Sequence, residues 1–202
     1  MRSPYPVSSD TVSCVLQAAQ EVFCTAGYRA SIDAVATRAG VARQTIYNNF
    51  GNKQKLFSRA IEHGMESFWA ELEPTGETIA EQLHCFGVKF RAHVLNPEMA
   101  RLHCMLTSEA LRFPEQARDF FEKAHMGTRH GIAALLASAM ASGQLRQDDA
   151  LEAAHFFIDG LIGVDLDRLL YAGEVPDPAQ EVARVQRHVD RFLRAYAPET
   201  IQ

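Results

Sequence analysis

Residues 31–53, SIDAVATRAGVARQTIYNNFGNK, decide the fold of the N-terminal part of the chain. Ser31 precedes a short segment with apolar residues at helical spacing, and Gly40 follows it, as a capping serine and a terminating glycine do. A second helical rhythm starts almost at once and runs to Phe50, so only about three residues of turn separate two helices. The stretch therefore predicts a helix-turn-helix over residues 31–50.

The second helix of this pair has two different faces. At about 100° per residue, Ala42, Ile46 and Phe50 share one side, which we predict to anchor the helix to the core. In the major groove of DNA, arginine pairs with guanine and asparagine or glutamine with adenine, whereas Tyr, Thr and Lys suit phosphates. We interpret the rest of the helix as a surface that reads DNA, with a solvated helix face as the alternative. Its polar side chains are Arg43, Gln44, Thr45, Tyr47, Asn48 and Asn49.

The formal net charge of -5 is unevenly distributed along the chain. Residues 1–60 hold seven Lys or Arg against three Asp or Glu, whereas the remaining 142 residues hold 13 against 22. A basic segment on an acidic chain favours contact between a polyanion and the N-terminal part alone.

Apolar residues follow the helical period almost throughout, and the alternation typical of strands is nearly absent. We expect an all-α protein of about nine helices. The first domain, residues 8–72, holds three helices and a linking fourth, and a larger helical domain spans residues 76–197. In the second domain the pattern predicts helices near 78–95, 97–112, 114–142, 149–171 and 178–196.

The chain lacks the roughly 20 consecutive apolar residues of a membrane span and the apolar core of a secretory signal, so we expect a cytoplasmic protein without membrane contact. Its four cysteines are widely spaced, as reduced thiols are. The pairs His84-Cys85 and His103-Cys104 contain zinc-ligand types, but neither has the spacing that puts two ligands on one metal. We expect no metal and no cofactor.

The segment FCTAGYRASIDAVATRAGVARQTIYNNFGNKQKLF, residues 23–57, resembles the DNA-binding domain of the TetR/AcrR transcriptional regulators. It shares their Gly-Tyr after the first helix, the Ala-Gly-Val turn, the Thr-x-Tyr-x-x-Phe recognition helix and the Lys that opens the next helix. Two residues depart from the pattern: Ala42 stands where the family often has a capping Ser, and Asn49 where His is common.

This resemblance implies roles for the polar side chains within residues 31–53. Thr45 and Tyr47 should contact phosphates and Lys53 the backbone, while the side chains nearest the base edges should be Arg43, Gln44 and Asn48. Ser31 and Asn49 complete the set of DNA-binding candidates.

Residues 111–124, LRFPEQARDFFEKA, and 142–157, SGQLRQDDALEAAHFF, are similar to the AefR-like subgroup of the family. The resemblance implies that the second domain binds a small ligand and dimerises. Candidate pocket residues are His103, Met105, Phe121, His125 and Phe156.

Residues 149–171 are apolar on most of the helical circumference, and the last helix adds a further apolar stripe, so two copies of this pair predict a four-helix dimer bundle. Completion of a monomer core is the alternative. Candidate interface residues are Phe157, Leu161, Val164, Val185, Val189 and Phe192.

We therefore expect a homodimeric, ligand-responsive transcriptional regulator, most often a repressor in this family, that binds a palindromic operator and an unknown small-molecule effector. The chain has no phosphate-cradling Gly-rich loop, nucleophile elbow or His-Glu-x-x-His, so we do not expect an enzyme. Two alternatives stay open: a redox-sensing regulator that uses the cysteines, and a small-molecule carrier without DNA activity.

Overall fold

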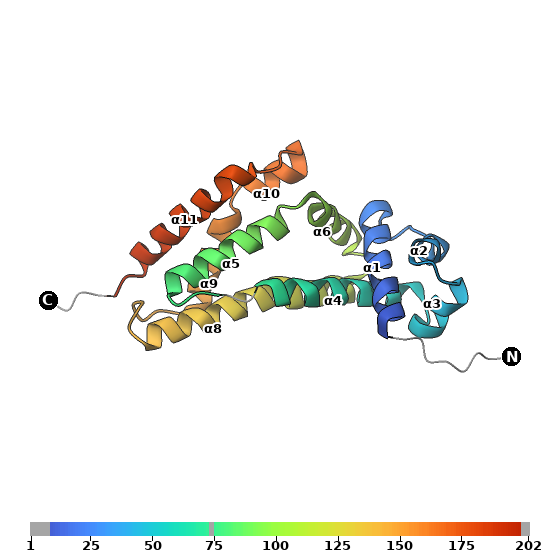
Figure 1. Cartoon of the computed structure of the whole chain (residues 1–202), viewed down its shortest axis with the longest axis horizontal. Helices are drawn as coiled ribbons and strands as arrows, with labels where there is room; N and C mark the ends of the chain where they lie inside the picture. The colour runs from blue at the N-terminus through green and yellow to red at the C-terminus, as the bar shows by residue number, and fades with distance from the viewer. Residues whose placement is uncertain (1–8, 73–74, 199–202) are drawn as a thin grey trace. The chain divides into compact units, whose positions relative to one another are not determined.

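The computed structural model describes residues 9–72 and 75–198, and within these ranges its regular structure is helical, without strands (Figure 1). The all-α prediction is confirmed. None of the described helices is long and apolar enough to cross a membrane. In chain order the elements are α1 (Ser9–Ala26), α2 (Ile32–Ala39), α3 (Arg43–Phe50), α4 (Lys53–Leu72), α5 (Ile79–Val94), α6 (Pro97–Glu109), α7 (Pro114–Phe120), the π-helix η1 (Phe121–Met126), α8 (Gly127–Ala141), α9 (Ala150–Ile162), α10 (Asp165–Asp167), the π-helix η2 (Arg168–Ala172) and α11 (Pro178–Ala195).

The chain packs as two compact units. The first runs to Phe68 and also includes Arg101–Phe120, and the second contains Trp69–Ala100 and the chain from Phe121 onward. This grouping in space differs from the predicted division along the chain, because residues 101–120 pack with the N-terminal unit. The rings of Tyr28 and Phe113, with centroids 4.3 Å apart, are part of that packing.

The core of the first unit is built from one face of each of its first four helices. Phe23 of α1 and Phe57 of α4 meet edge to face, with ring centroids 5.1 Å apart. Burying such side chains stabilises each helix far more than its intrinsic propensity does. The other buried residues of these helices include Val15, Leu16, Ala19, Ile32, Val35, Ala36, Ile46, Phe50, Leu56, Ala60 and Ile61.

The predicted helix over residues 149–171 is wrong in its length. Asp149 caps α9, its carboxylate accepting from the N–H groups of Leu151 and Glu152, but the helix ends at Ile162. Gly163 then takes φ +51° and ψ -138°, a conformation that strongly favours glycine, and the chain continues as α10 and η2. The predicted helix over 114–142 is likewise divided, into α7, η1 and α8.

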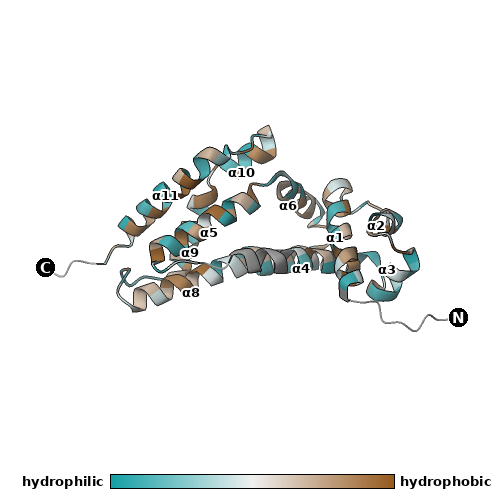
Figure 2. Ribbon diagram, in the orientation of Figure 1, coloured by the Kyte–Doolittle hydropathy of each residue, from teal (hydrophilic) through white to brown (hydrophobic). Residues whose placement is uncertain are grey.

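Helices α5, α9 and α11 form the core of the second unit. Gly87 brings α5 close to its neighbours, since a Cβ built there would lie 2.7 Å from Val185 Cγ1. Figure 2 shows hydrophobic and hydrophilic residues alternating along α11, as expected for a helix with one buried face. The buried side chains of the three helices include Leu83, Phe86, Phe90, Ala153, Ala154, Phe157, Ile158, Leu161, Val185, Val189 and Phe192.

One buried cation, Arg91, connects α5 with α9, α10 and α11. The Arg91 side chain of α5 is only 2% exposed, and its Nη2 donates to Asp165 Oδ2 at 2.8 Å. Its Nε donates to Glu181 Oε2 of α11 at 2.6 Å, and its Nη1 to the Leu161 carbonyl at the end of α9. A buried charge needs such partners, so Arg91 fixes how the second unit packs.

Candidate nucleic-acid interface

The predicted helix-turn-helix over residues 31–50 is present as α2 and α3. The Ser31 hydroxyl accepts from the Ala34 N–H at 3.1 Å and so caps α2. Gly40 adopts a left-handed conformation, with φ +66°, and the next N–H, of Val41, donates to the Ala36 carbonyl at 3.0 Å. The bonds donated by Gly40 and Val41 satisfy carbonyls at the end of α2, and the chain turns directly into α3.

The inner face of α3 holds the helix against the core. Ile46 and Phe50 are 1% and 7% exposed. Ala42, predicted as a third anchor, is exposed instead. It is the N-cap residue, with extended backbone at φ -71° and ψ 143°, and therefore does not share the helical face. Its side chain makes no capping hydrogen bond, as expected where Ser is replaced by Ala.

The outer face of α3 presents side chains that bond to one another. Gln44 Nε2 donates to Asn48 Oδ1 at 2.9 Å, one turn along the helix. Arg43 donates from Nη2 to the Tyr47 hydroxyl at 3.3 Å and from Nη1 to Asp33 Oδ2 of α2 at 3.2 Å. The Tyr47 bond and the Asp33 charge raise the pKa of Arg43. Arg43, Gln44 and Asn48 are exposed and Tyr47 is half-buried, so the face is a set of accessible donors and acceptors held in defined positions.

Thr45 and Asn49 lie beside this face. Asn49 Nδ2 donates to the Thr45 carbonyl at 2.7 Å, so its amide folds back onto α3. An amide in this position offers its oxygen to an incoming donor, and its NH2 group keeps a second N–H that can donate to a phosphate.

Lys53 opens α4 and is held by an aromatic ring. Its Nζ lies 4.5 Å from the centroid of Tyr28, within the range of a cation–π interaction. Arg112 lies near the same ring, with its guanidinium carbon 5.8 Å from the centroid. Burial lowers the pKa of Lys53, and the nearby charge of Arg112 lowers it further.

The roles of Tyr28 and Arg112 were not predicted. Tyr28 belongs to the Gly-Tyr motif, which the sequence connects only with the end of the first helix. Arg112 is far from Lys53 in sequence, and no spacing rule relates two residues on separate segments. Only the packing of residues 101–120 within the first unit brings them to one ring.

Two family models match this chain, one at each end of the sequence. A family model described as bacterial regulatory proteins of the tetR family matches residues 15–60. A second, described as the C-terminal domain of AefR-like transcriptional repressors, matches residues 81–198, more than half of the chain. The chain belongs to the TetR family of transcriptional regulators.

Individual proteins of the family extend over the same length. A probable HTH-type transcriptional regulator, ArpR of Pseudomonas putida, is 26% identical over 199 residues, covering 92% of this chain and 91% of its own. The solved structure of a TetR-family regulator from Mesorhizobium loti is 20% identical, with a TM-score of 0.86, over 96% of this chain and all of its own. The flavonoid-responsive regulator FrrA is 26% identical, with a TM-score of 0.79 and the same coverage.

The predicted pocket residues of this TetR-family regulator are distributed over both units. His103 and Met105 belong to the first unit, where burial lowers the pKa of His103. In the second unit, Phe121 stacks on His125, with ring centroids 5.8 Å apart. Phe156 is 57% exposed and lies against Phe192 and Tyr196, with each pair of centroids 6.3 Å apart.

The predicted interface residues of this TetR-family regulator need correction. All except Val164 are at most 2% exposed within a single chain, so their side chains have no surface left for a partner. They pack in the core of α5, α9 and α11, because α9 and α11 bury one face each before any second copy is present. Val164 is 54% exposed. The five buried residues are Phe157, Leu161, Val185, Val189 and Phe192.

Proposed function

We propose that this TetR-family regulator is a ligand-responsive repressor that binds a palindromic operator as a homodimer. The observation that carries the proposal is the outer face of α3, where exposed hydrogen-bonding side chains stand on a helix whose inner face is fixed by Ile46 and Phe50. A fixed helix with an ordered polar face suits insertion into the major groove. Such a protein acts in the cytoplasm, where bacterial DNA lies.

The polar residues take two kinds of role in this proposal. Arg43, Gln44 and Asn48 face the base edges, and their mutual hydrogen bonds exchange for bonds to bases when DNA binds. The residues proposed to bind the backbone are Ser31, Thr45, Tyr47, Asn49 and Lys53. Exposure of the first group and the placement of Lys53 beside Tyr28 support this division.

Dimerisation would use the outer surfaces of α9 and α11. Phe156 and Val182 expose 57% and 54% of their surface on these two helices, and Val164 lies two residues after the end of α9. A partner that covers these side chains would remove their apolar surface from water. A two-fold dimer presents two copies of α3, so its operator should be an approximate palindrome with half-sites about one or more helical turns apart.

An effector in the second unit would shift the population towards a dimer whose two α3 helices no longer fit successive major grooves. To release most of the bound protein, the effector must prefer that state by several kcal/mol. The similarity to a flavonoid-responsive regulator makes flavonoids the first compounds to test.

Gel-shift titration against the DNA upstream of the regulator's own gene tests the proposal. We expect salt-dependent binding with two chains per operator and release by an effector. A protein with Tyr47→Ala and Lys53→Ala should lose binding while it keeps its helical content. If the unaltered protein shows no salt-dependent binding to any upstream palindrome, the carrier alternative is favoured.

A further inference from the structure

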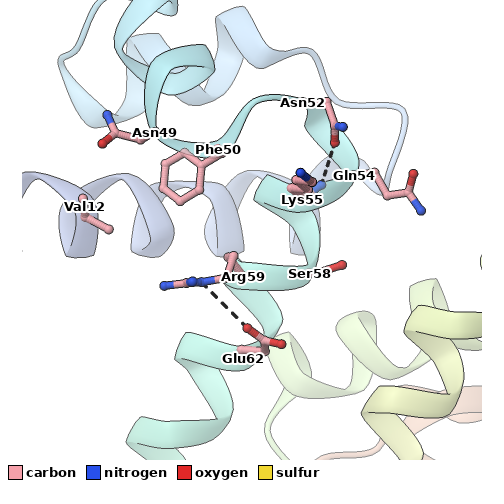
Figure 3. Close-up of a pocket in the computed structure, with 9 residues that line it drawn as sticks. All are labelled: Val12, Asn49, Phe50, Asn52, Gln54, Lys55, Ser58, Arg59 and Glu62. Carbon is pink, nitrogen blue, oxygen red and sulfur yellow. Dashed lines mark hydrogen bonds and ion pairs between the residues drawn. The ribbon is translucent and has the colours of Figure 1, made fainter.

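A groove of about 650 Å³ lies beside the end of α3, between the start of α1 and the first turns of α4. We call it the α1/α4 groove. Val12 and Phe50 supply its apolar part, and Figure 3 shows the polar side chains arranged around them. Those polar residues are Asn49, Asn52, Gln54, Lys55, Ser58 and Arg59, with Glu62 at the margin.

The cations of the α1/α4 groove outnumber its acids. Lys55 and Arg59 are exposed and lie one turn apart on the same side of α4. Like charges at this spacing destabilise a helix slightly unless an anion lies near them. Among the described residues, Glu62 is the one acid that lines the groove, and its Oε2 is 3.8 Å from Arg59 Nε, too far for a hydrogen bond.

The groove continues the proposed DNA-binding surface. Asn49 belongs both to its lining and to the residues proposed to contact the backbone. Phosphates follow one another along a DNA strand about every 3.4 Å of helix rise, so a strand held near Asn49 offers further phosphates to neighbouring cations. The Arg59 side chain is 62% exposed, which suits contact with a hydrated phosphate better than burial around a small molecule.

We propose that the α1/α4 groove binds the phosphodiester backbone of DNA through Lys55 and Arg59, extending the contact beyond the helix-turn-helix and Lys53. This inference rests on the proposed function, because it assumes that α3 enters the major groove of DNA. In the free protein the Glu62 carboxylate lies near Arg59, and a DNA phosphate would have to compete with it for the guanidinium group. The Glu62 carboxylate should therefore weaken DNA binding.

The test measures the dependence of the dissociation constant on salt, for the upstream DNA and for a short duplex of unrelated sequence. The slope of log K against log salt should fall by about 0.9 for each phosphate that is no longer neutralised in Lys55→Gln and in Arg59→Gln, equally on both duplexes. Glu62→Gln should instead tighten binding to both. Arg194→Gln, which removes an exposed cation of α11, should change neither slope nor affinity.

Two results separate this inference from the proposed function. If Lys53→Gln lowers the slope but Lys55→Gln and Arg59→Gln leave it unchanged, the groove does not bind DNA and the proposed function stands. If the unaltered protein does not bind DNA, the proposed function fails and the groove inference with it. Circular dichroism checks that each variant retains its fold.

Discussion

Lys53 Nζ lies 4.5 Å from the centroid of the Tyr28 ring, so the side chain proposed to hold a DNA phosphate is positioned before DNA arrives. Burial lowers the pKa of Lys53, and the charge of Arg112, which approaches the same ring, lowers it further. A phosphate bound at Lys53 would relieve this repulsion.

The first prediction concerns the charge of Lys53. Arg112→Gln removes a neighbouring cation and should raise the pKa of Lys53 towards its ordinary value of 10.5. A lysine whose pKa is lower in the folded state than in the unfolded state destabilises the fold at neutral pH. This destabilisation disappears as the pH rises from the pKa of the folded state to the pKa of the unfolded state. NMR titration of the lysine side chains measures the pKa directly. Arg118→Gln, on the exposed side of α7, serves as the control, and an unchanged pKa in Arg112→Gln would contradict the coupling.

The second prediction separates base contacts from phosphate contacts on α3. Arg43→Ala should weaken binding to the operator by about 1–3 kcal/mol and relax base preference at one position of each half-site. Tyr47→Ala should weaken binding to operator and unrelated DNA alike, because phosphates carry no sequence information. Binding to a set of single-base operator variants distinguishes the two. Equal losses on all sequences for Arg43→Ala would remove its base-reading role.

The third prediction concerns the cap of α3. Ala42 has the extended backbone of an N-cap residue but no side-chain hydrogen bond, and it is exposed. Ala42→Ser should therefore raise the free energy of unfolding by about 1 kcal/mol, whereas Ser31→Ala should lower it by a similar amount. Urea denaturation of both variants measures the difference. A destabilised Ala42→Ser protein would show that the new hydroxyl fails to reach an N–H group of α3.

The fourth prediction concerns the buried Arg91. Arg91→Ala removes the most deeply buried cation beside Asp165, which is only 5% exposed, and leaves the half-exposed Arg184 as the cation shared by Asp165 and Glu181. Removing one member of a buried ion pair costs about 3–5 kcal/mol, which is a large part of the stability of a small domain. Denaturant unfolding measures the loss. Arg146→Ala, which breaks the half-exposed pair with Asp148, should cost at most about 1 kcal/mol.

The fifth prediction concerns the proposed dimer surface. Val182→Asp places a charge on an exposed apolar position of α11 and should weaken dimerisation at least about tenfold, since burial of an unpaired charge is costly. Val175→Asp is a matched control, because Val175 is 56% exposed but lies between η2 and α11. Sedimentation equilibrium measures both. Equal dimer affinity for the two variants would place the interface elsewhere.

Local sequence determined the helix-turn-helix in detail. The capping Ser31, the left-handed Gly40 and the apolar positions Ile46 and Phe50 act over a few residues, so the boundaries of the helix-turn-helix follow from the order of residues alone. The exposed polar face of α3 follows from the same periodicity. Ala42 was misplaced because a helical projection does not apply to a residue that precedes the helix.

Tertiary structure decided which apolar residues are buried within one chain. The sequence indicates that α9 and α11 carry apolar surface. In the structure Phe157 and Val189 face the core, while Phe156 and Val182 remain exposed. Where apolar residues cover most of a helix, periodicity does not tell which of them face the core. The meeting of Lys53 and Arg112 at the Tyr28 ring likewise depends on packing between segments distant in sequence. The sequence by itself thus determined the fold class and the helix with the exposed polar face, because their signals are local. The partners of each buried charge and ring were decided by the three-dimensional arrangement.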